Sequence, residues 1–463
     1  MLRTTPFHSR IAPLNLAQNW RRWSGYLAAS AYEFHHDREY WAIRNSAAMI
    51  DVSPLYKYGI EGPDAERLLD RVVTRDVTKC ELHQVFYTPW CDDDGKVMDD
   101  GTLTRLADDS FRLTSAEPNL RWLQDNALGM NVGIRDISDD LAALALQGPN
   151  ARRILHDAAD GAADDLRFFR LTKGEIGGVP VEITRTGYTG DLGYEIWTDP
   201  ANAEALWDGL MEAGDKHRIL PAGMLALDVA RVEAGLILIS VDYVPAHQAV
   251  IEGRKSSPFE LGLGWTVKLG GNWFVGRDAL IAEKERGPEW EFRGLDVSWD
   301  SLEALYGEVG LPPQLPSEGW RTSVPVYSGN TQVGYATSGC WSPLLKKYIA
   351  LAHIQSQYAG IGTNLRVEVT VEHYHDLGKF LFAFIFFWGY IGFSQFLIIW
   401  YANLPEETMW YKDRLTPAWE MWSWFIVFGH FALPFAGILS RHVKRSRVGL
   451  LVLASYALLM HWI

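Results

Sequence analysis

The stretch from Phe380 to Tyr401 constrains the fold of this chain most, because it contains no charged residue. A helix of this length crosses the roughly 30 Å hydrocarbon core of a bilayer. Trp422 to Ser440 is a second segment of adequate length, whereas Val448 to Ile463 is shorter than the roughly 20 residues of a usual span. The sequence therefore predicts two or three transmembrane helices within residues 376–463. A buried helical hairpin in a soluble core is the alternative.

The charges between these segments predict an orientation. Basic residues lie between the second and third segments, and the acidic loop Pro405-Glu-Glu-Thr lies between the first and second. The basic residues are Arg441, Lys444, Arg445 and Arg447. Because basic loops stay on the cytoplasmic side, the first helix would also begin there, next to Lys379. We therefore expect a multi-pass membrane protein whose preceding residues lie in the cytoplasm.

The chain as a whole has the composition of an ordinary globular protein. A net charge of −14 argues against a nucleic-acid partner, because phosphate binding needs a basic face. Cys80, Cys91 and Cys340 form no CxxC pair and no zinc spacing. We therefore predict neither a metal site nor a disulfide framework.

Up to about Glu372, short apolar runs alternate with helical stretches, which predicts an α+β fold. Phe111–Thr114 and Val181–Thr184 are typical of strands, and Ala203–Ala213 is typical of a helix. After Gly287 the chain becomes rich in β-branched runs, which predicts a small barrel. These runs are Val324–Tyr327, Val333–Thr337, Ile349–His353 and Leu365–Val371. We expect domain boundaries at 1–285, 286–372 and 376–463.

From Tyr87 to Gly101 the sequence predicts two strands joined by an acidic turn at Asp92–Gly95. Asp99 and Asp100 follow this turn. Neighbouring side chains of a strand point to opposite faces, so only one of the two can enter a given pocket. A buried carboxylate with a raised pKa can accept or orient the proton of a substrate amine. From these residues alone, a solvated acidic pair is the alternative.

Arg185 to Ile196 predicts a strand that enters a glycine-rich turn and leaves as another strand. Glycines at 187, 190 and 193 would let the backbone approach a flat ligand. Glu195 offers two acceptor oxygens, which match the adjacent N–H donors of a pterin ring. The glycine spacing is not that of a phosphate or dinucleotide loop. A plain hairpin is the alternative.

Further short motifs accompany these two stretches over about the first 372 residues. In order they read Asp51-Val-Ser, Gly62-Pro-Asp-Ala, Tyr87 with Asp99-Asp100, Leu146-Gln-Gly-Pro-Asn-Ala, Gly187-Tyr-Thr-Gly with Gly193-Tyr-Glu, Arg231-Val-Glu-Ala-Gly-Leu, Gly264-Trp, Phe274-Val-Gly-Arg and Val333-Gly-Tyr-Ala-Thr-Ser-Gly-Cys-Trp-Ser-Pro. This order resembles the glycine cleavage T-protein family. The resemblance implies a cloverleaf of small domains around a folate channel, with a carboxy-terminal β-barrel.

The resemblance also implies a function and its residues. Asp100 matches the catalytic carboxylate that faces the reactive nitrogens of tetrahydrofolate, and Glu195 matches the glutamate that binds the pterin. Tyr87 and Tyr188 match tyrosines that line the ring, and Asp99 is placed with them as a cofactor-binding residue. The implied reaction transfers a methyl or aminomethyl unit from a small donor to tetrahydrofolate, with a lipoyl carrier protein as a further partner.

Two departures from the family pattern bear on the donor. Pro54 stands where the family usually has a histidine, and Leu227 stands where it usually has an arginine. The missing arginine removes a fixed bidentate donor. A stand-alone demethylase that acts on a small N-, O- or S-methyl compound is therefore at least as well favoured as a lipoyl-linked enzyme. A folate-binding module without turnover is a second hypothesis.

The tail carries a separate resemblance. Its motifs are His375-Asp-Leu-Gly-Lys-Phe, Phe393-Ser-Gln-Phe, Trp400-Tyr-Ala-Asn-Leu-Pro-Glu-Glu-Thr and Ser440-Arg-His-Val-Lys-Arg. They resemble a membrane subunit of the alternative quinol:cytochrome c oxidoreductase complex, which implies a fragment of a quinol-oxidising complex as a third hypothesis. Two interpretations of the junction stay open: a membrane-tethered enzyme, and a joining of two unrelated sequences.

Overall fold

The computed structural model describes residues 2–308, 310, 312–313, 315–367, 372–440, 443–444 and 446–462. Its contacts divide the chain into two units, residues 1–367 and residues 368–463. The apolar tail thus forms a unit of its own. The predicted division of the first unit at residue 285 stays a prediction.

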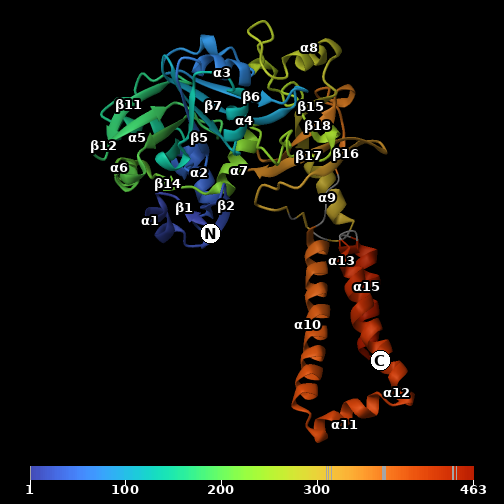
Figure 1. Ribbon diagram of the computed structural model, residues 1–463. Coiled ribbons are helices and arrows are strands. Elements are labelled where there is room, and N and C mark those ends of the chain that lie inside the picture. The colour runs from blue at the N-terminus through green and yellow to red at the C-terminus, as the bar shows by residue number, and fades with distance from the viewer. Residues whose placement is uncertain are drawn as a thin grey trace. The chain divides into compact units, whose positions relative to one another are not determined.

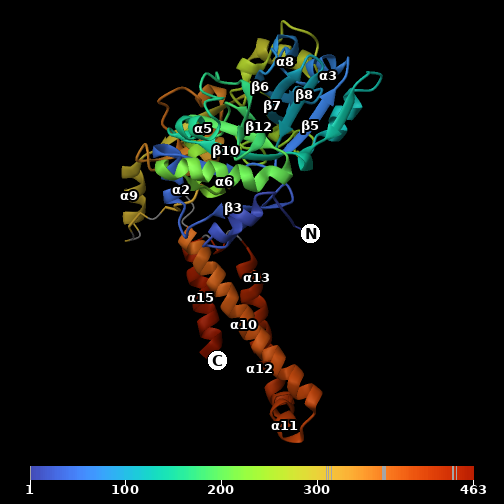
Figure 2. The same cartoon turned by 90° about the vertical axis from the view of Figure 1, so that its left-hand side faces the viewer.

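A six-stranded sheet forms one part of the first unit, in the order β11-β12-β13-β10-β4-β14. Its strands are β4 (Ala48–Asp51), β10 (Ala142–Gln147), β11 (Leu171–Ile176), β12 (Val179–Thr184), β13 (Gly193–Thr198) and β14 (Leu220–Pro221). Leu144 and Ile196 face a core under α5 (Ala151–Ala158) and α6 (Ala203–Gly214), which Figure 2 shows across this sheet. The predicted strand at Val181–Thr184 and the predicted helix are confirmed.

A five-stranded sheet in the order β6-β7-β8-β5-β9 carries the acidic hairpin. Its strands are β5 (Tyr56–Glu61), β6 (Val85–Cys91), β7 (Val97–Ala107), β8 (Ser110–Ser115) and β9 (Gly133–Asp136). The helix α3 (Ala65–Val72) packs Leu68 and Leu69 against this sheet and lies beside β6 and β7 in Figure 1. Gly95 has φ +72° in the turn between β6 and β7, a conformation that glycine adopts without strain. The predicted strand–turn–strand is confirmed.

The β-rich part of the first unit is an open sheet in the order β15-β18-β17-β16-β19. Its strands are β15 (Trp290–Val297), β16 (Val324–Ser328), β17 (Thr331–Ser342), β18 (Lys347–Gln355) and β19 (Arg366–Val367). The predicted runs are confirmed as strands, but β15 and β19 remain unpaired edges among the described residues, so the expected barrel does not close there. The end of the predicted run Leu365–Val371 lies outside the described residues.

The remaining elements of the first unit connect and cover these sheets. They are β1 (Arg3–Thr4), β2 (Asn19–Trp23) and β3 (Tyr26–Ala31) in a small sheet, and α1 (His8–Ile11), α2 (Asp37–Asn45), α4 (Leu120–Asn126), α7 (Met224–Glu233), α8 (Arg277–Arg286) and α9 (Trp299–Gly307). The β-rich composition after Gly287 did not predict α9. This helix begins where Ser298 accepts a hydrogen bond from the Ser301 N–H, a side-chain N-cap.

The second unit is helical. Its elements are α10 (Glu372–Ala402), α11 (Pro405–Arg414), α12 (Pro417–Ile426), the π-helical segment η9 (Val427–Ala432), α13 (Leu433–Leu439) and α15 (Arg447–Trp462). Leu377–Ala402 and Pro417–Leu439 are long and apolar enough to cross a membrane, and Val448–Met460 is a shorter apolar helix. The expected loop at Pro405 instead opens α11, because proline fits the first turn of a helix.

The surface of these helices is apolar. In the most apolar stretch of Leu377–Ala402, only 6% of the residues are buried within the chain. The corresponding share for Pro417–Leu439 is 22%. Phe387 and Trp400 are 59% and 67% exposed on α10. A buried hairpin of a soluble core would hide such side chains, so this exposure argues against that alternative.

Candidate active site

Asp100 lies on β7 and receives two phenol donors. The Tyr87 hydroxyl donates to Oδ2 at 2.8 Å, and the Tyr243 hydroxyl donates to Oδ1 at 2.5 Å. In the β6–β7 ladder, Asp100 pairs with Pro89, two residues along the strand from Tyr87. Side chains at such diagonal positions on one face of a sheet are within reach of each other. The structure thus brings the predicted residues Tyr87 and Asp100 together.

Burial is the main influence on the pKa values of the three side chains in this cluster. It raises the pKa of Asp100, and the hydrogen bonds from Tyr243 and Tyr87 oppose that rise. Burial and the neighbouring Asp100 charge raise the pKa of both tyrosines well above the usual range, so both stay protonated as donors. A fixed carboxylate of raised pKa is a suitable acceptor for a substrate proton.

Asp99 has partners of a different kind. It is fully buried, and its Oδ2 accepts from the Asn119 side-chain amide at 2.7 Å and from the Glu117 N–H at 3.1 Å. Its Oδ1 accepts from the Asp100 N–H at 2.8 Å. Both oxygens are therefore occupied by the chain itself. The assignment of Asp99 to the cofactor stays a prediction, and these contacts favour a structural role for it.

Glu195 lies on β13 beside a pair of threonines. Its Oε2 accepts from the Thr186 hydroxyl at 2.5 Å, and that hydroxyl lies 2.8 Å from the Thr184 hydroxyl. Burial raises the pKa of Glu195, while the Thr186 hydrogen bond and the charge of Arg112 oppose the rise. In the described part of the chain, no hydrogen bond reaches Oε1 of Glu195. One oxygen of this part-buried carboxylate can therefore accept from a ligand N–H.

The glycines near Glu195 are required by a side chain of the protein. A Cβ on Gly187 would lie 2.3 Å from the Gln147 Oε1 atom, and one on Gly193 would lie 2.1 Å from it. The Gln147 Oε1 atom also accepts from the Thr189 hydroxyl at 2.9 Å. The turn itself was predicted correctly, but a buried amide, and not a ligand, explains why these two positions carry glycine.

Tyr188 uses its hydroxyl within the protein. The phenol donates to the Ile237 carbonyl, and burial raises its pKa. The charge of Asp100 adds to that rise, which places Tyr188 in the electrostatic surroundings of the Asp100 cluster. The hydroxyl is therefore engaged within the protein, and the ring packs against the buried residues that include those of α7.

Two aromatic residues complete the cluster. Tyr243 lies in a loop after α7 with no motif of its own, so no signal in the sequence pointed to it. Trp265, from the Gly264-Trp motif, stacks on Tyr87 with ring centroids 6.1 Å apart and planes 25° apart. Trp265 is 55% exposed, so the aromatic stack extends from the part-buried Asp100 carboxylate to the surface.

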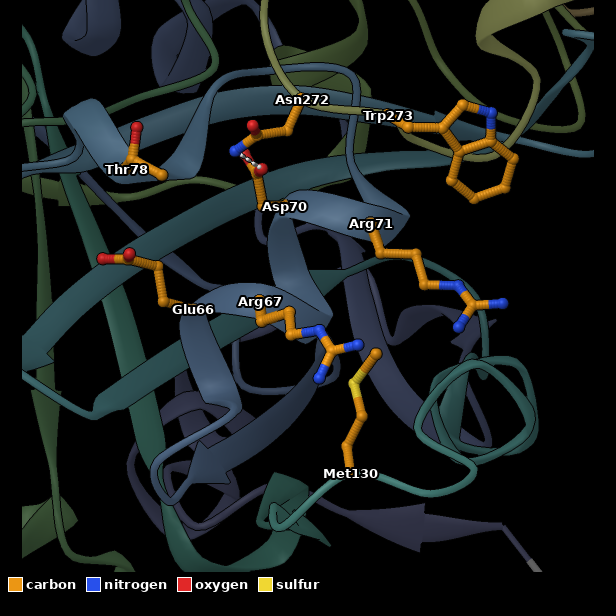
Figure 3. Close-up of a pocket in the computed structure, with 8 residues that line it drawn as sticks. All are labelled: Glu66, Arg67, Asp70, Arg71, Thr78, Met130, Asn272 and Trp273. Atoms are coloured by element: carbon orange, nitrogen blue, oxygen red, sulfur yellow. Dashed lines mark hydrogen bonds between the residues drawn. The ribbon is translucent and has the colours of Figure 1, made fainter.

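A separate cavity of about 510 Å³ lies beside α3 (Figure 3). Its lining comprises Glu66, Arg67, Asp70, Arg71, Thr78, Met130, Asn272 and Trp273. None of the predicted site residues lines it. Asp70 accepts from Asn272 at 2.6 Å and Glu66 pairs with Arg105 at 2.8 Å, so both acids are already engaged. The Asp100 cluster is therefore the better candidate for acid–base chemistry.

Comparison with known proteins identifies the family of the first unit. Residues 10–271 match the family model of the GCVT N-terminal domain, and residues 309–375 match that of the glycine cleavage T-protein C-terminal barrel domain. An aminomethyltransferase of Halothermothrix orenii is 34% identical over 72% of this chain and 86% of its own length. A trimethylamine-oxide aldolase of Ruegeria pomeroyi is 35% identical over 80% of this chain, but the chain spans only 45% of that relative.

A solved structure supports the fold. The glycine cleavage system aminomethyltransferase T of Bartonella henselae superposes with a TM-score of 0.68, covers 80% of this chain and 94% of its own, and is 24% identical. The family model that matches residues 10–271 covers the strands that carry both carboxylates. The chain therefore belongs to the glycine cleavage T-protein family and is an enzyme of tetrahydrofolate-dependent one-carbon transfer.

Proposed function

We propose that Asp100 is the proton acceptor in this transfer and that Glu195 binds the pterin. The observation that carries the proposal is the Asp100 carboxylate held by Tyr87 and Tyr243 at 2.8 and 2.5 Å. Bound tetrahydrofolate supplies the nitrogen that accepts the carbon. Asp100 takes the proton that this nitrogen loses when the new carbon–nitrogen bond forms, and returns it to the departing heteroatom when the donor's bond to carbon breaks.

The residues around Glu195 fit the flat end of a pterin. Its Oε2 is fixed by Thr186, so the carboxylate plane is held, and Oε1 is available to a ring N–H. The rings of Tyr87 and Tyr188 supply apolar area next to the Asp100 end. Positioning between these groups provides the near-attack geometry that accounts for much of the rate of such transfers.

For the donor we propose a small methylated amine or amine oxide. The name of the Ruegeria pomeroyi relative, a trimethylamine-oxide aldolase, supports this class. Leu227 supports it as well, because this buried apolar side chain stands where the family usually has an arginine. An aminomethyl group on a lipoyl carrier is the second candidate, which the names of the aminomethyltransferase relatives support.

An assay of the full chain in detergent distinguishes these donors. Trimethylamine N-oxide, methylated amines and an aminomethyl-loaded lipoyl carrier are each supplied with tetrahydrofolate, and the one-carbon-loaded folate is measured by mass. We expect loading from a methylated amine, which yields a methyl-folate and one demethylated amine, or from its oxide, which yields a methylene-folate, one demethylated amine and one water. Loading only from the lipoyl carrier would select the second candidate. Folate binding without loading from any donor would indicate a binding module and contradict the proposal.

We propose further that the second unit anchors the enzyme in a membrane with the Lys444 loop on the cytoplasmic side. The full chain should sediment with membranes and resist extraction by alkaline carbonate, because Leu377–Ala402 and Pro417–Leu439 match the hydrocarbon thickness. Release of the chain by carbonate would contradict the proposal. The resemblance of the tail to a quinol-oxidising membrane subunit stays a prediction, and quinol-dependent reduction of a cytochrome by purified membranes would support it.

A further inference from the structure

Asp242 precedes Tyr243 and collects donors from three parts of the first unit. The side chain is 1% exposed. Its Oδ2 accepts from Arg231 and from the Leu238 N–H, the latter at 2.8 Å. Its Oδ1 accepts from two hydroxyls of β17, that of Thr337 at 2.6 Å and that of Ser338. The loop that carries Tyr243 is thus tied to the carboxy-terminal sheet.

The two hydroxyls reach one oxygen because β17 is irregular at this point. The pairing of β17 with β18 shifts register between Ala336 and Ser338, so Thr337 is the extra residue of a bulge. In a regular strand, neighbouring side chains point to opposite faces. A bulge turns two successive side chains toward the same side. The bulge therefore has a specific result here, which is a pair of donors aimed at Asp242.

A second contact ties the same loop to β18. The His353 Nε2 donates to the Asp242 carbonyl at 2.6 Å, and burial lowers the pKa of His353, so this imidazole is neutral. The backbone of Tyr243 is held in turn, because its carbonyl accepts from the Ser240 N–H at 2.8 Å. The Asp242 side chain and its carbonyl thus both face the carboxy-terminal sheet, while the next side chain faces Asp100.

We propose that the Thr337–Ser338 bulge is a positioning element that holds the Tyr243 hydroxyl on Asp100 through Asp242. The inference rests on the proposed role of Asp100. It gives the carboxy-terminal sheet a part in the chemistry, although none of its residues touches the reacting atoms. Without the two hydroxyls, the Asp242 carboxylate still pairs with Arg231 and the Leu238 N–H, so its buried charge remains compensated. The loop that carries Tyr243 then loses two of the contacts that fix its orientation.

Loss of the Thr337 and Ser338 hydroxyls should change the pKa of Asp100 in a defined direction. The titratable groups that interact electrostatically with Asp100 are Tyr87, Tyr188, Tyr243 and, from the opposite face of β7, Asp99. Of these, the Tyr243 and Tyr87 hydroxyls donate to the carboxylate and lower its pKa. Asp100 accepts a proton only when ionised, so turnover falls as the pH drops through this pKa. Loosening Tyr243 raises the pKa, and the acid limb of the kcat profile moves to higher pH.

The test compares Thr337→Val/Ser338→Ala with Tyr243→Phe and with the control Thr331→Val/Ser328→Ala. The control makes the same chemical changes at the β16–β17 turn of the same sheet. We expect the bulge variant to shift the acid limb of kcat upward by about 0.7 pH unit, the equivalent of one hydrogen bond of about 1 kcal/mol, with the folate KM unchanged. Tyr243→Phe should shift it in the same direction, and the control should not shift it.

Combining the variants tests whether the effect of the bulge on Asp100 passes through the Tyr243 hydroxyl. In the Tyr243→Phe background the bulge substitutions should add no further shift, because their effect passes through the missing hydroxyl. A full additional shift, or a bulge variant that loses thermal stability with an unchanged acid limb, would overturn the proposal. Infrared titration of the protonated-carboxyl band that Asp100→Asn removes reports the same shift without turnover. If this band titrates at a higher pH in the bulge variant but the chain loads no folate, the proposed function is contradicted and the positioning role is supported.

Discussion

Replacement of Asp100 by asparagine is expected to lower kcat by about 10²- to 10⁴-fold, the usual worth of a positioned general base. The amide has the size of the carboxylate but takes no proton at neutral pH. Tyr87 and Tyr243 donate to different oxygens of the carboxylate, so in the amide one of the two phenols would face an NH₂ group in place of its acceptor. Because the pterin end of the site is unchanged, the Kd for tetrahydrofolate should change less than about threefold, under 1 kcal/mol.

The neighbouring residue provides the matched control. Asp99→Asn makes the same chemical change one position away, at a carboxylate whose partners are Asn119 and two backbone N–H groups. It should destabilise the fold by about 1–3 kcal/mol, since an amide hydrogen would face these donors, and leave kcat per folded molecule unchanged. Calorimetric titration and single-turnover rates separate the two outcomes. Normal turnover by the Asp100 variant would show that another group accepts the proton.

The acidic hairpin was predictable because its signals are local. Alternating strand residues, a glycine in the turn and antiparallel pairing suffice to bring Tyr87 near Asp100, and the period of a strand suffices to separate Asp99 from Asp100. Tyr243 was not predictable in this way. It reaches Asp100 across 143 positions of sequence from an irregular loop, and that loop is held by the carboxy-terminal sheet. Only tertiary packing fixes such a contact.

The other differences between the sequence-based predictions and the structure also arise from tertiary packing. Gly187 and Gly193 predicted a turn correctly, but the Gln147 amide that makes them necessary comes from another strand. The carboxy-terminal strands were predicted from their β-branched runs, whereas sheet closure depends on edge pairing that a single run does not encode. The apolar helices were predictable from the absence of charge alone, because the length and hydropathy of an apolar helix are properties of one continuous segment.

Removal of the Glu195 carboxylate should act on binding and not on chemistry. Glu195→Ala is expected to raise the Kd for tetrahydrofolate by about 10- to 100-fold, or 1.4–2.8 kcal/mol, because buried ring N–H groups lose a charged acceptor. At saturating folate, kcat should be retained, since Asp100 and Tyr87 lie on other strands and Tyr243 lies in a loop. Glu175→Ala, at an exposed position of β11 in the same sheet, is the control and should leave Kd unchanged.

A milder substitution, at Thr186, and a change of pH test the same role of Glu195. Thr186→Val should weaken binding only about fivefold, because it removes the support of Oε2 and leaves the carboxylate in place. Burial raises the pKa of Glu195, and the ionised form binds, so wild-type affinity should fall as the pH drops through that raised pKa. The alanine variant has no such group and should lose this dependence. An unchanged Kd in Glu195→Ala, with the pH dependence intact, would mean that the pterin is held elsewhere.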